Sequence, residues 1–468
     1  MSQNNNNKDK EGGVLNIAFY PWFALGHLTS FLRLANKLAE KGHNISFFLP
    51  TKTQSKFASQ NHYPNHLKFM PIDIPHVDGL PPWAETTNDV PVSAVSLIMT
   101  AMDLTRDTIE SHLTLLKPDF VFYDFSYWMP ELCRKLGIKS VHYITGFIAR
   151  YAGLAFSVKE YQNSPGKAHQ WPTPPNLPSQ IFQMRPHEAK ILDPIVKIRL
   201  GLKGVSYGEM FCISLRECDA IAVKTCKEME QIYCEYIENT LQKPVLLAGP
   251  VVPKPPSSKL VDHHATWLNG FDAATVIYCA LGSECALSLN QFQHLLLGLE
   301  LTGKPFLTAL KPPKEYETVE SAFPEGFAER IKGRGIVQGG WVQQQLILQH
   351  PSVGCFITHC GAASLSEAMA SQCQIVLMPQ GVDQFTNAKQ MSLELKIGVE
   401  VEAKEDDGLF TKEAINKAIS LVMEQDSQIG REVMVNHAKW RDFILTEGLE
   451  DSYITTFIQS LQHLLPSF

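Results

Sequence analysis

Residues 341–384 decide the fold of the second half of this chain, and they read WVQQQLILQHPSVGCFITHCGAASLSEAMASQCQIVLMPQGVDQ. The apolar run 355–358 follows Gly354 and predicts a buried strand. It leads into residues 359–361, after which the apolar spacing becomes helical as far as Met369. A strand, a tight glycine turn and a helix N-terminus form an anion site, because free backbone N–H groups and the helix dipole point outward there.

Four side chains near this turn have the chemistry of a nucleotide site. His359 and Ser364 flank the turn and add hydrogen-bond donors for a phosphate. Glu367, one helical turn further on, can accept hydrogen bonds from a ribose diol, and Trp341 offers a flat face to a base. Taken singly, such a Trp usually belongs to a core, such a His has a structural role and such a Glu is solvated on a helix. Their joint order and spacing favour the nucleotide interpretation.

This pattern resembles the signature segment of plant secondary-product glycosyltransferases, the family that uses UDP-sugars. The pattern is long and specific, and it extends over the whole of the stretch quoted above. The matching positions are Trp341, Gln344, Leu348, His350, Gly354, Phe356, His359, Cys360, Gly361, Ser364, Glu367, Pro379, Asp383 and Gln384.

Five positions depart from the family pattern. The family usually has Pro at Gln343, Trp and Asn at Ala362 and Ala363, and Gly and Pro at Gln372 and Gln374. The missing Asn removes one side-chain donor near the phosphates. The forms WVQQ and CQIVLMPQ resemble the branch of the family that adds a sugar to a sugar already attached to a flavonoid or an anthocyanin.

Composition indicates a globular protein. Its 468 residues favour two domains over one, and 44% hydrophobic with 19% charged residues is enough for sizeable cores. The net charge of −7 argues against a nucleic-acid partner or an anionic membrane surface. The ten cysteines show no CxxC pair, and no apolar run is long enough to span a bilayer. We therefore expect a cytoplasmic protein with reduced thiols and no stable membrane insertion, and we expect a monomer.

Alternating apolar runs and helical spacings predict two doubly wound parallel α/β sheets. Expected strands of the first half are 14–20, 45–49, 67–72, 120–123, 139–143, 220–223 and 245–247. Expected helices there are 29–41, 92–116, 127–136, 188–200 and 208–216. In the second half we expect strands 276–280, 306–310, 336–338 and 355–358, and helices 290–301, 412–424, 429–446 and 452–464.

This organisation resembles the GT-B fold of the same family, in which two Rossmann-like domains face a cleft that holds donor and acceptor. We expect a disordered tail over 1–13, an acceptor-binding domain over 14–248 and a linker over 249–262. A UDP-sugar-binding domain over 263–447 follows. The resemblance implies that a final helix within 448–468 packs back on the first domain.

His27 is the candidate general base. It follows Gly26 near the carboxyl end of the first strand, where ligands bind in open α/β sheets, and imidazole accepts protons near neutral pH. Asp124 ends a neighbouring strand, so its carboxylate can fix the tautomer of His27 and stabilise the imidazolium. Alternatively, His27 caps the helix and Asp124 begins a turn. The catalytic His–Asp dyad of the family falls on these two positions.

The resemblance also implies a donor site. Its residues are Ser283, Trp341, Val342, Gln344, His359, Gly361, Ser364, Glu367, Asp383 and Gln384. Asp383 and Gln384 would bind sugar hydroxyls, whereas Ser283 has an ordinary N-cap as its alternative role. No carboxylate cluster suggests a metal site, so we expect the helix dipole, His and Ser to replace a divalent ion. UDP-glucose, UDP-xylose or UDP-rhamnose is the expected co-substrate, and no cofactor is expected.

Aromatic and polar side chains near the strand ends of the first half are candidates for acceptor binding, because aromatic faces suit phenolics and sugar rings. The candidates are Trp22, Phe23, Tyr127, Thr145 and Phe147, together with Trp128. A place in the core is a strong alternative for Trp128 and Phe147. A phenolic glycoside is the expected acceptor. The alternatives are transfer to an aglycone hydroxyl, a nucleotide-sugar epimerase of the same fold, and a catalytically silent binding protein.

Overall fold

The chain forms two compact units in a computed structural model that describes residues 13–163, 176–177, 179–250, 252, 258–282, 285–424 and 426–466. Unit 1 comprises Met1–Pro174, Asp193–Pro250 and Gly448–Phe468, and unit 2 comprises Pro175–Leu192 and Val251–Glu447. Residues 1–12 of the expected tail and residues 251 and 253–257 of the expected linker lie outside the described residues. Unit 2 includes residues 175–192, which the sequence pattern had suggested for the first domain.

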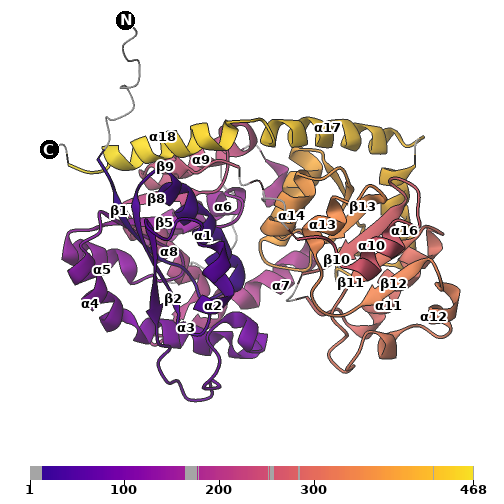
Figure 1. Ribbon diagram of the computed structural model, residues 1–468, viewed down its shortest axis with the longest axis horizontal. Coiled ribbons are helices and arrows are strands. Elements are labelled where there is room, and N and C mark those ends of the chain that lie inside the picture. The colour runs from indigo at the N-terminus through magenta and orange to yellow at the C-terminus, as the bar shows by residue number, and fades with distance from the viewer. Residues whose placement is uncertain are drawn as a thin grey trace, which may run out of the picture. The chain divides into compact units, whose positions relative to one another are not determined.

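The sheet of unit 1 has the parallel order β3-β2-β1-β4-β5-β8-β9. Figure 1 labels β1, β2, β5, β8 and β9 of this sheet. Its strands are β1 (Asn16–Tyr20), β2 (Asn44–Pro50), β3 (Leu67–Ile72), β4 (Phe120–Tyr123), β5 (Lys139–Ile144), β8 (Ala220–Val223) and β9 (Val245–Leu247). The chain winds outward from β1 to β3 and then crosses to the other side of β1. Tyr20 pairs with Tyr123, so the residues that follow β1 and β4 emerge side by side at this crossover.

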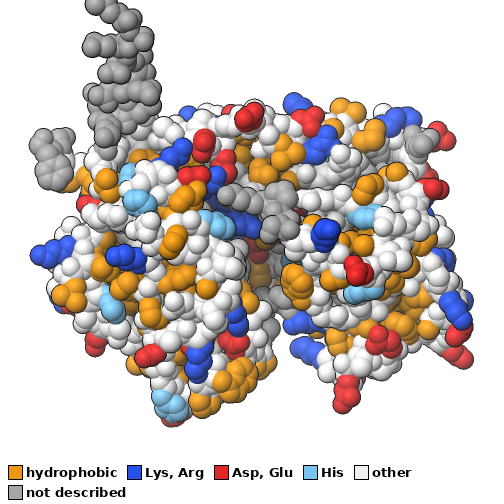
Figure 2. All heavy atoms as spheres, in the orientation of Figure 1, with side chains coloured by type: hydrophobic (Ala, Val, Ile, Leu, Met, Phe, Trp, Pro, Cys, Tyr) orange, Lys and Arg blue, Asp and Glu red, His pale blue; other side chains and the backbone are white. Residues whose placement is uncertain are grey.

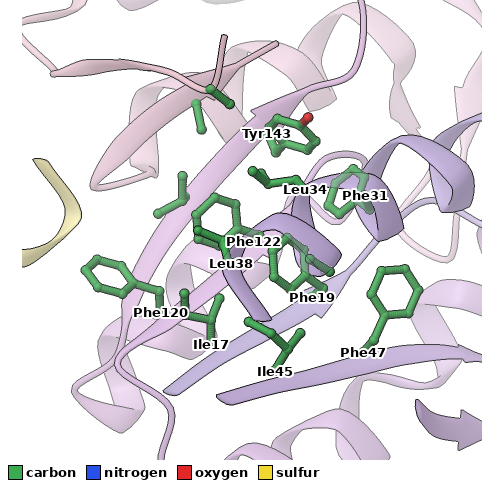
Figure 3. Packing of buried hydrophobic residues seen from close by; sticks show 14 of the residues in the cluster. Ile17, Phe19, Phe31, Leu34, Leu38, Ile45, Phe47, Phe120, Phe122 and Tyr143 are labelled. Carbon is green, nitrogen blue, oxygen red and sulfur yellow. The ribbon is translucent and has the colours of Figure 1, made fainter. Parts of the chain in front are cut away.

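Apolar side chains from both ends of the chain fill one face of this sheet (Figure 3). The ring of Phe19 stacks on that of Phe122 at 4.9 Å, and Phe31 of α1 (Leu25–Glu40) meets Phe19 edge-on at 6.1 Å. The terminal helix α18 (Leu449–His463) adds Phe457, whose ring lies 6.1 Å from that of Phe122. The central strands β1, β4, β5 and β8 are buried on both faces, which is why each reads as a nearly continuous apolar run.

The other helices of unit 1 connect these strands in the doubly wound manner. They are α2 (Gln54–Phe57), α3 (Val95–Leu104), α4 (Arg106–Leu116), α5 (Met129–Leu136), α6 (Ala149–Asn163), α8 (Tyr207–Glu217) and α9 (Lys227–Leu241). The helix α7 (Pro186–Lys197) begins in unit 2 and ends in unit 1, and the strands β6 (Arg199–Leu200) and β7 (Val205–Ser206) form a small antiparallel ribbon after it. The expected end of a helix at 200 is therefore wrong by three residues.

The expected helix over 92–116 is interrupted at Thr105, between α3 and α4. The buried Thr105 hydroxyl donates to the carbonyl of Met102 at 2.8 Å and lies 2.5 Å from the hydroxyl of Tyr20. A side chain that bonds back to the preceding turn competes with the helical pattern, which explains the break.

The sheet of unit 2 has the parallel order β12-β11-β10-β13-β14-β15. Its strands are β10 (Val276–Ala280), β11 (Phe306–Ala309), β12 (Gly335–Gln338), β13 (Val353–Thr358), β14 (Gln374–Leu377) and β15 (Gly398–Glu400). Its helices are α10 (Asp262–Leu268), α11 (Leu289–Leu301), α12 (Phe327–Arg330), α13 (Gln344–Leu348), α14 (Ala362–Met369), α15 (Gln384–Lys389), α16 (Lys412–Met423) and α17 (Gln428–Ile444). The predicted class, two doubly wound α/β domains, is confirmed.

The surface carries both signs of charge. Acidic and basic side chains are interspersed on the visible face of each unit (Figure 2). Among the helices that the structure describes, none is long and apolar enough to cross a bilayer.

Candidate functional site

His27 and Asp124 lie together at the crossover of the unit 1 sheet. His27 is the third residue of α1, and Asp124 follows β4 directly. The distance between His27 Nδ1 and Asp124 Oδ2 is 2.6 Å. The Asp124 side chain is 5% exposed, whereas that of His27 is 29% exposed. The bond occupies Nδ1 and leaves Nε2 as the ring nitrogen that can receive a proton from a substrate.

Backbone groups fix the orientation of the Asp124 carboxylate. Its Oδ1 accepts hydrogen bonds from the backbone N–H of Trp22 at 2.7 Å and from that of Phe125 at 2.8 Å. Phe125 also presents its ring to His27 at 5.5 Å and stacks on Trp22 at 5.2 Å. Phe125 was absent from the sequence-based site, although its place directly after Asp124 at a strand end was a usable signal.

The candidate acceptor residues divide into buried and accessible groups. Trp22, Phe23 and Tyr127 are 5%, 0% and 8% exposed, and burial raises the pKa of Tyr127 to about 12. Thr145 and Phe147 are partly exposed on the loop after β5, and the Thr145 hydroxyl lies 3.5 Å from His27 Nδ1. The structure therefore brings Thr145 to the His27–Asp124 pair, whereas Phe23 lies wholly within the core.

Trp128 has a structural environment. Its Nε1–H donates to the buried carboxylate of Asp103 at 2.9 Å, and the guanidinium of Arg106 lies 5.9 Å from the centre of its ring. The backbone N–H of Leu202 donates to the same carboxylate at 3.0 Å. Trp128 thus connects α5 to α3, in agreement with the core alternative.

In unit 2, the His359 ring fits between two glycines at the crossover of β10 and β13. A Cβ atom on Gly282 would lie 2.7 Å from His359 Nε2, and one on Gly361 would lie 2.5 Å from it. Both distances are far below van der Waals contact, so neither position tolerates a larger residue without movement of the ring. Burial lowers the pKa of His359, against the opposing influence of Asp383 and the carbonyl of Ala280.

The backbone of the turn between β13 and α14 is strained. Cys360 has a left-handed φ of 68°, and Val382, which precedes Asp383, has a φ of 45°. Such conformations cost free energy in residues with a side chain and concentrate at functional sites. The Asn387 amide stabilises both places, because it donates to the carbonyl of Cys360 at 3.0 Å and to Asp383 Oδ2 at 3.1 Å.

The N-terminus of α14 is open to an anion. Gly361 is its N-cap and no side chain caps the helix, so the backbone N–H groups of the first turn are available. Ser364 lies in that first turn, and His359 immediately precedes it. The Ala363 side chain, where the family has Asn, is exposed.

The Glu367 carboxylate is held by two neighbouring amides. Gln344 Nε2 donates to Oε2 at 2.6 Å and Gln345 Nε2 donates to Oε1 at 3.0 Å. The Gln344 amide also reaches the Ser364 hydroxyl at 3.3 Å and accepts from the Tyr278 hydroxyl at 3.2 Å. Gln345 was absent from the sequence-based site, because its contact with Glu367 depends on the packing of α13 against α14.

Trp341 and Val342 differ in exposure. Trp341 is 86% exposed, which leaves its ring free to stack on a base, and Val342 is 8% exposed. Gln343, at the position of the family proline, accepts from the backbone N–H of Val261 at 2.7 Å and donates to the carbonyl of Lys259 at 2.9 Å. It therefore joins the segment before α10 to the start of α13.

Asp383 and Gln384 begin α15, and Asp383 is its N-cap residue. Gln384 Oε1 accepts from the backbone N–H of Gln380 at 2.9 Å, so the side chain lies over the preceding turn. The expected contribution of Ser283 falls outside the described residues. Within the described ranges there is no group of three or more His, Cys, Asp or Glu residues placed to hold a metal ion.

Comparisons with known proteins agree with this geometry. Residues 326–437 match the model of the family described as UDP-glucoronosyl and UDP-glucosyl transferase. The chain is 51% identical over 97% of its length to a cyanidin 3-O-galactoside 2''-O-xylosyltransferase of Actinidia chinensis var. chinensis, 99% of which is covered. The chain belongs to this family. It is a UDP-sugar-dependent glycosyltransferase.

A second relative of this glycosyltransferase is an anthocyanidin 3-O-glucoside 2''-O-glucosyltransferase of Ipomoea nil, 50% identical over 96% of the chain and 98% of the relative. Solved structures share the fold. A UGT of Glycyrrhiza uralensis complexed with glycyrrhetinic acid 3-O-monoglucuronide has a TM-score of 0.78 and 22% identity, over 97% of this chain and 96% of that one. An anthocyanidin 3-O-glucosyltransferase in complex with UDP has a TM-score of 0.74 at 22% identity, over 97% and 99% of the two chains. The predicted GT-B fold is confirmed.

Proposed function

We propose that this glycosyltransferase transfers a sugar from a UDP-sugar to a hydroxyl of the sugar on a flavonoid glycoside, with inversion at the anomeric carbon. The names of the relatives in Actinidia and Ipomoea support this acceptor, because both describe transfer to the 2'' position of a sugar already attached to an anthocyanidin. The hydrogen bond between His27 and Asp124 carries the catalytic part of the proposal.

In the proposed reaction, the oxygen of the acceptor hydroxyl attacks the anomeric carbon of the donor sugar. At the same time, His27 Nε2 takes the proton of that hydroxyl. The bond between that carbon and the diphosphate oxygen breaks on the opposite face, and UDP leaves with the bonding electrons. Asp124 stabilises the imidazolium and keeps the ring in the tautomer that exposes a basic Nε2. Positioned proton transfer of this kind contributes about 10²- to 10⁴-fold.

On the donor side, we propose that the N-terminus of α14 together with His359 and Ser364 stabilises the departing diphosphate. Glu367 would accept hydrogen bonds from the ribose, Trp341 would stack on the base, and Asp383 with Gln384 would bind the sugar. The three candidate sugar donors are UDP-glucose, UDP-xylose and UDP-rhamnose. We propose that no metal ion takes part, so EDTA is expected to leave the rate unchanged, and inhibition reversed by magnesium would contradict this.

The acceptor is tested by a matched pair. Each of the three UDP-sugars is incubated with one flavonoid aglycone and with its 3-O-monoglucoside at equal concentration, and products are measured by mass. We expect faster transfer to the glucoside, because polar groups that receive the sugar would be unpaired with the aglycone, at a cost of about 1–3 kcal/mol each. Faster transfer to the aglycone would support the alternative acceptor, and UDP binding without any product would support a silent binding protein.

We further propose that the enzyme is a cytoplasmic monomer. All ten cysteines are free thiols, and nine of them are buried, which suits a reducing compartment. Cell fractionation and light scattering of the purified protein test the location and the oligomeric state.

A further inference from the structure

Residues 179–192, which we call the strap, lie in sequence between two segments of unit 1 but belong to unit 2. The strap contacts α15 and the short π-helix Gln390–Glu394 that continues it. Near its start, the Ser179 hydroxyl donates to Glu394 Oε1 at 2.7 Å. The contacts then move along α15 toward its N-terminus.

The middle and end of the strap continue this antiparallel course. The Lys389 ammonium donates to the carbonyl of Gln183 at 2.7 Å, and the ring of His187 meets that of Phe385 edge-on at 5.9 Å. Ile191 is the nearest neighbour of a Cβ atom placed on Gly381, at 3.9 Å. The strap therefore follows the whole of α15, including the turn that precedes Asp383.

A buried ion pair anchors the strap. Lys389 Nζ lies 2.5 Å from Glu188 Oε2, and the two side chains are only 6% and 1% exposed. The backbone N–H of Arg185 donates to the same Glu188 oxygen at 2.9 Å, and the Arg185 guanidinium forms a forked ion pair with Glu400 on β15. The Lys389 ammonium bonds both Glu188 and the Gln183 carbonyl, so this charge-assisted pair joins the strap to α15. The other carboxylate oxygen, Glu188 Oε1, is buried without a hydrogen bond and lies 3.7 Å from the Arg185 guanidinium.

We propose that Glu188 and Lys389 are positioning residues for the donor sugar. Lys389 is the last residue of α15, and the helix begins at Asp383 and Gln384, so the ion pair sets where these two side chains stand. A displacement of about 1 Å at a reacting group can cost a hundredfold in rate. This inference rests on the proposed function, which assigns the sugar hydroxyls to Asp383 and Gln384.

If the Glu188–Lys389 ion pair positions the donor sugar, its loss should impair the use and selection of the sugar more than the binding of the nucleotide. The test uses the double variant Glu188→Gln/Lys389→Met, which leaves no unpaired buried charge. We expect kcat/KM for the best UDP-sugar to fall at least tenfold and discrimination among UDP-glucose, UDP-xylose and UDP-rhamnose to narrow. The Kd of UDP, measured by calorimetry, should rise by much less than kcat/KM falls, because Glu367 and Trp341 lie outside the strap and α15 reaches the α14 turn through the Asn387 bond to the Cys360 carbonyl.

Three controls separate positioning from general loss of stability. Ile415→Ala opens the core of unit 2 away from the strap and should lower the melting temperature without narrowing sugar discrimination. Removal of the exposed pair Lys417–Glu402 should leave all parameters unchanged. The single variant Lys389→Arg retains the positive charge beside Glu188. It should therefore discriminate among the three UDP-sugars much better than the double variant does. If the double variant does not fold, Arg185→Gln, at a half-exposed position, tests the same strap with a smaller expected loss.

Two outcomes would overturn the inference: unchanged sugar discrimination in a folded double variant, or UDP affinity that falls in proportion to kcat/KM. Asp383→Asn in the otherwise unchanged enzyme identifies a failure of the proposed function itself. If that substitution leaves the use of every UDP-sugar unchanged, the sugar assignment is wrong. If it impairs sugar use while the strap variants do not, only the positioning role is wrong.

Discussion

At the scale of single residues, the His27–Asp124 pair makes the sharpest prediction. We expect His27→Ala to lower kcat by a hundredfold or more while UDP binds normally, because the base acts on the acceptor and not on the nucleotide. Asp124→Asn should also slow the reaction and shift its pH profile, since the amide cannot stabilise the imidazolium. Steady-state kinetics and calorimetry with UDP check both variants. Normal turnover of the His27→Ala variant would exclude His27 as the general base.

Gln345 makes a second prediction about the nucleotide. Its amide holds Glu367 Oε1 at 3.0 Å, and a carboxylate oxygen that accepts one bond still has a second lone pair for a ribose hydroxyl. We expect Gln345→Leu to leave Glu367 less well oriented and to raise the Kd of UDP about three- to tenfold, from the loss of about 1 kcal/mol of hydrogen bonding.

A nucleotide that lacks the diol distinguishes this explanation from a general disturbance of α13. With 2',3'-dideoxy-UDP, the effect of Gln345→Leu should largely disappear. Gln349→Leu, at an exposed position just after the same helix, is the matched control and should bind UDP normally. An equal loss of affinity for both nucleotides would contradict the role of Glu367.

At the scale of elements, the close packing of Gly361 against His359 in the turn between β13 and α14 lets us predict what one added methyl group does to stability and UDP binding. Gly361 has a φ of −65°, which alanine adopts readily, so Gly361→Ala adds no left-handed strain. Besides the modest cost of alanine at an N-cap, it tests the contact with His359. The new Cβ would lie 2.5 Å from Nε2, so the ring must move. We expect a loss of about 1–3 kcal/mol in unfolding free energy, together with weaker UDP binding.

The background His359→Ala makes this test specific. There the methyl group meets no ring, so Gly361→Ala should cost little further stability in urea denaturation. A cost that is the same with and without the His359 ring would show that the glycine is required for another reason.

The sequence indicated most strands of the two sheets, because strands buried on both faces appear as short apolar runs whatever their neighbours are. It missed β14 and β15, which complete the sheet of unit 2. The local pattern was also enough to predict that His27 lies near Asp124, since each residue follows one such apolar run. It did not reveal α6 and α9, which had no assigned spacing, or the break at Thr105, which depends on the hydroxyl of Tyr20.

Contacts between segments distant in sequence were the part that local pattern could not predict. Glu188 and Lys389 are separated by 201 residues, and the composition of neither segment indicates that it contacts the other. The same holds for the orientation of Gln345 toward Glu367, which depends on how α13 packs on α14. Their roles, like those of the other site residues, stay predictions until tested.

At the scale of the whole molecule, both units use the same topological device. In each sheet the strand order reverses beside the first strand, between β1 and β4 in unit 1 and between β10 and β13 in unit 2. Each crossover presents a histidine, His27 in one and His359 in the other. Open α/β sheets bind ligands at such points because the adjacent loops separate there.

Each unit also contains a deeply buried histidine outside the site, which predicts how its stability depends on pH. Burial lowers the pKa of both His142 in unit 1 and His437 in unit 2 to about 4. His142 Nδ1 lies 3.0 Å from the Ser214 hydroxyl, and His437 Nε2 lies 3.1 Å from the carbonyl of Ala368 at the end of α14. Between pH 6.5 and about 4 the unfolded chain therefore binds more protons than the folded protein at both positions.

We expect the unfolding free energy to be constant above pH 7 as far as these groups decide it, and to fall as the pH drops from about 6.5 toward 4. The loss is on the order of 3 kcal/mol for each histidine. Urea denaturation at pH 7.5, 6.0, 5.0 and 4.5 measures it. His142→Gln should flatten the pH dependence of unit 1, and His437→Gln that of unit 2, whatever each substitution does to the absolute stability. The exposed His76, replaced by Gln, is the control and should change no slope. If both buried-site variants keep the slope of the unsubstituted protein, protonation of other groups governs acid unfolding.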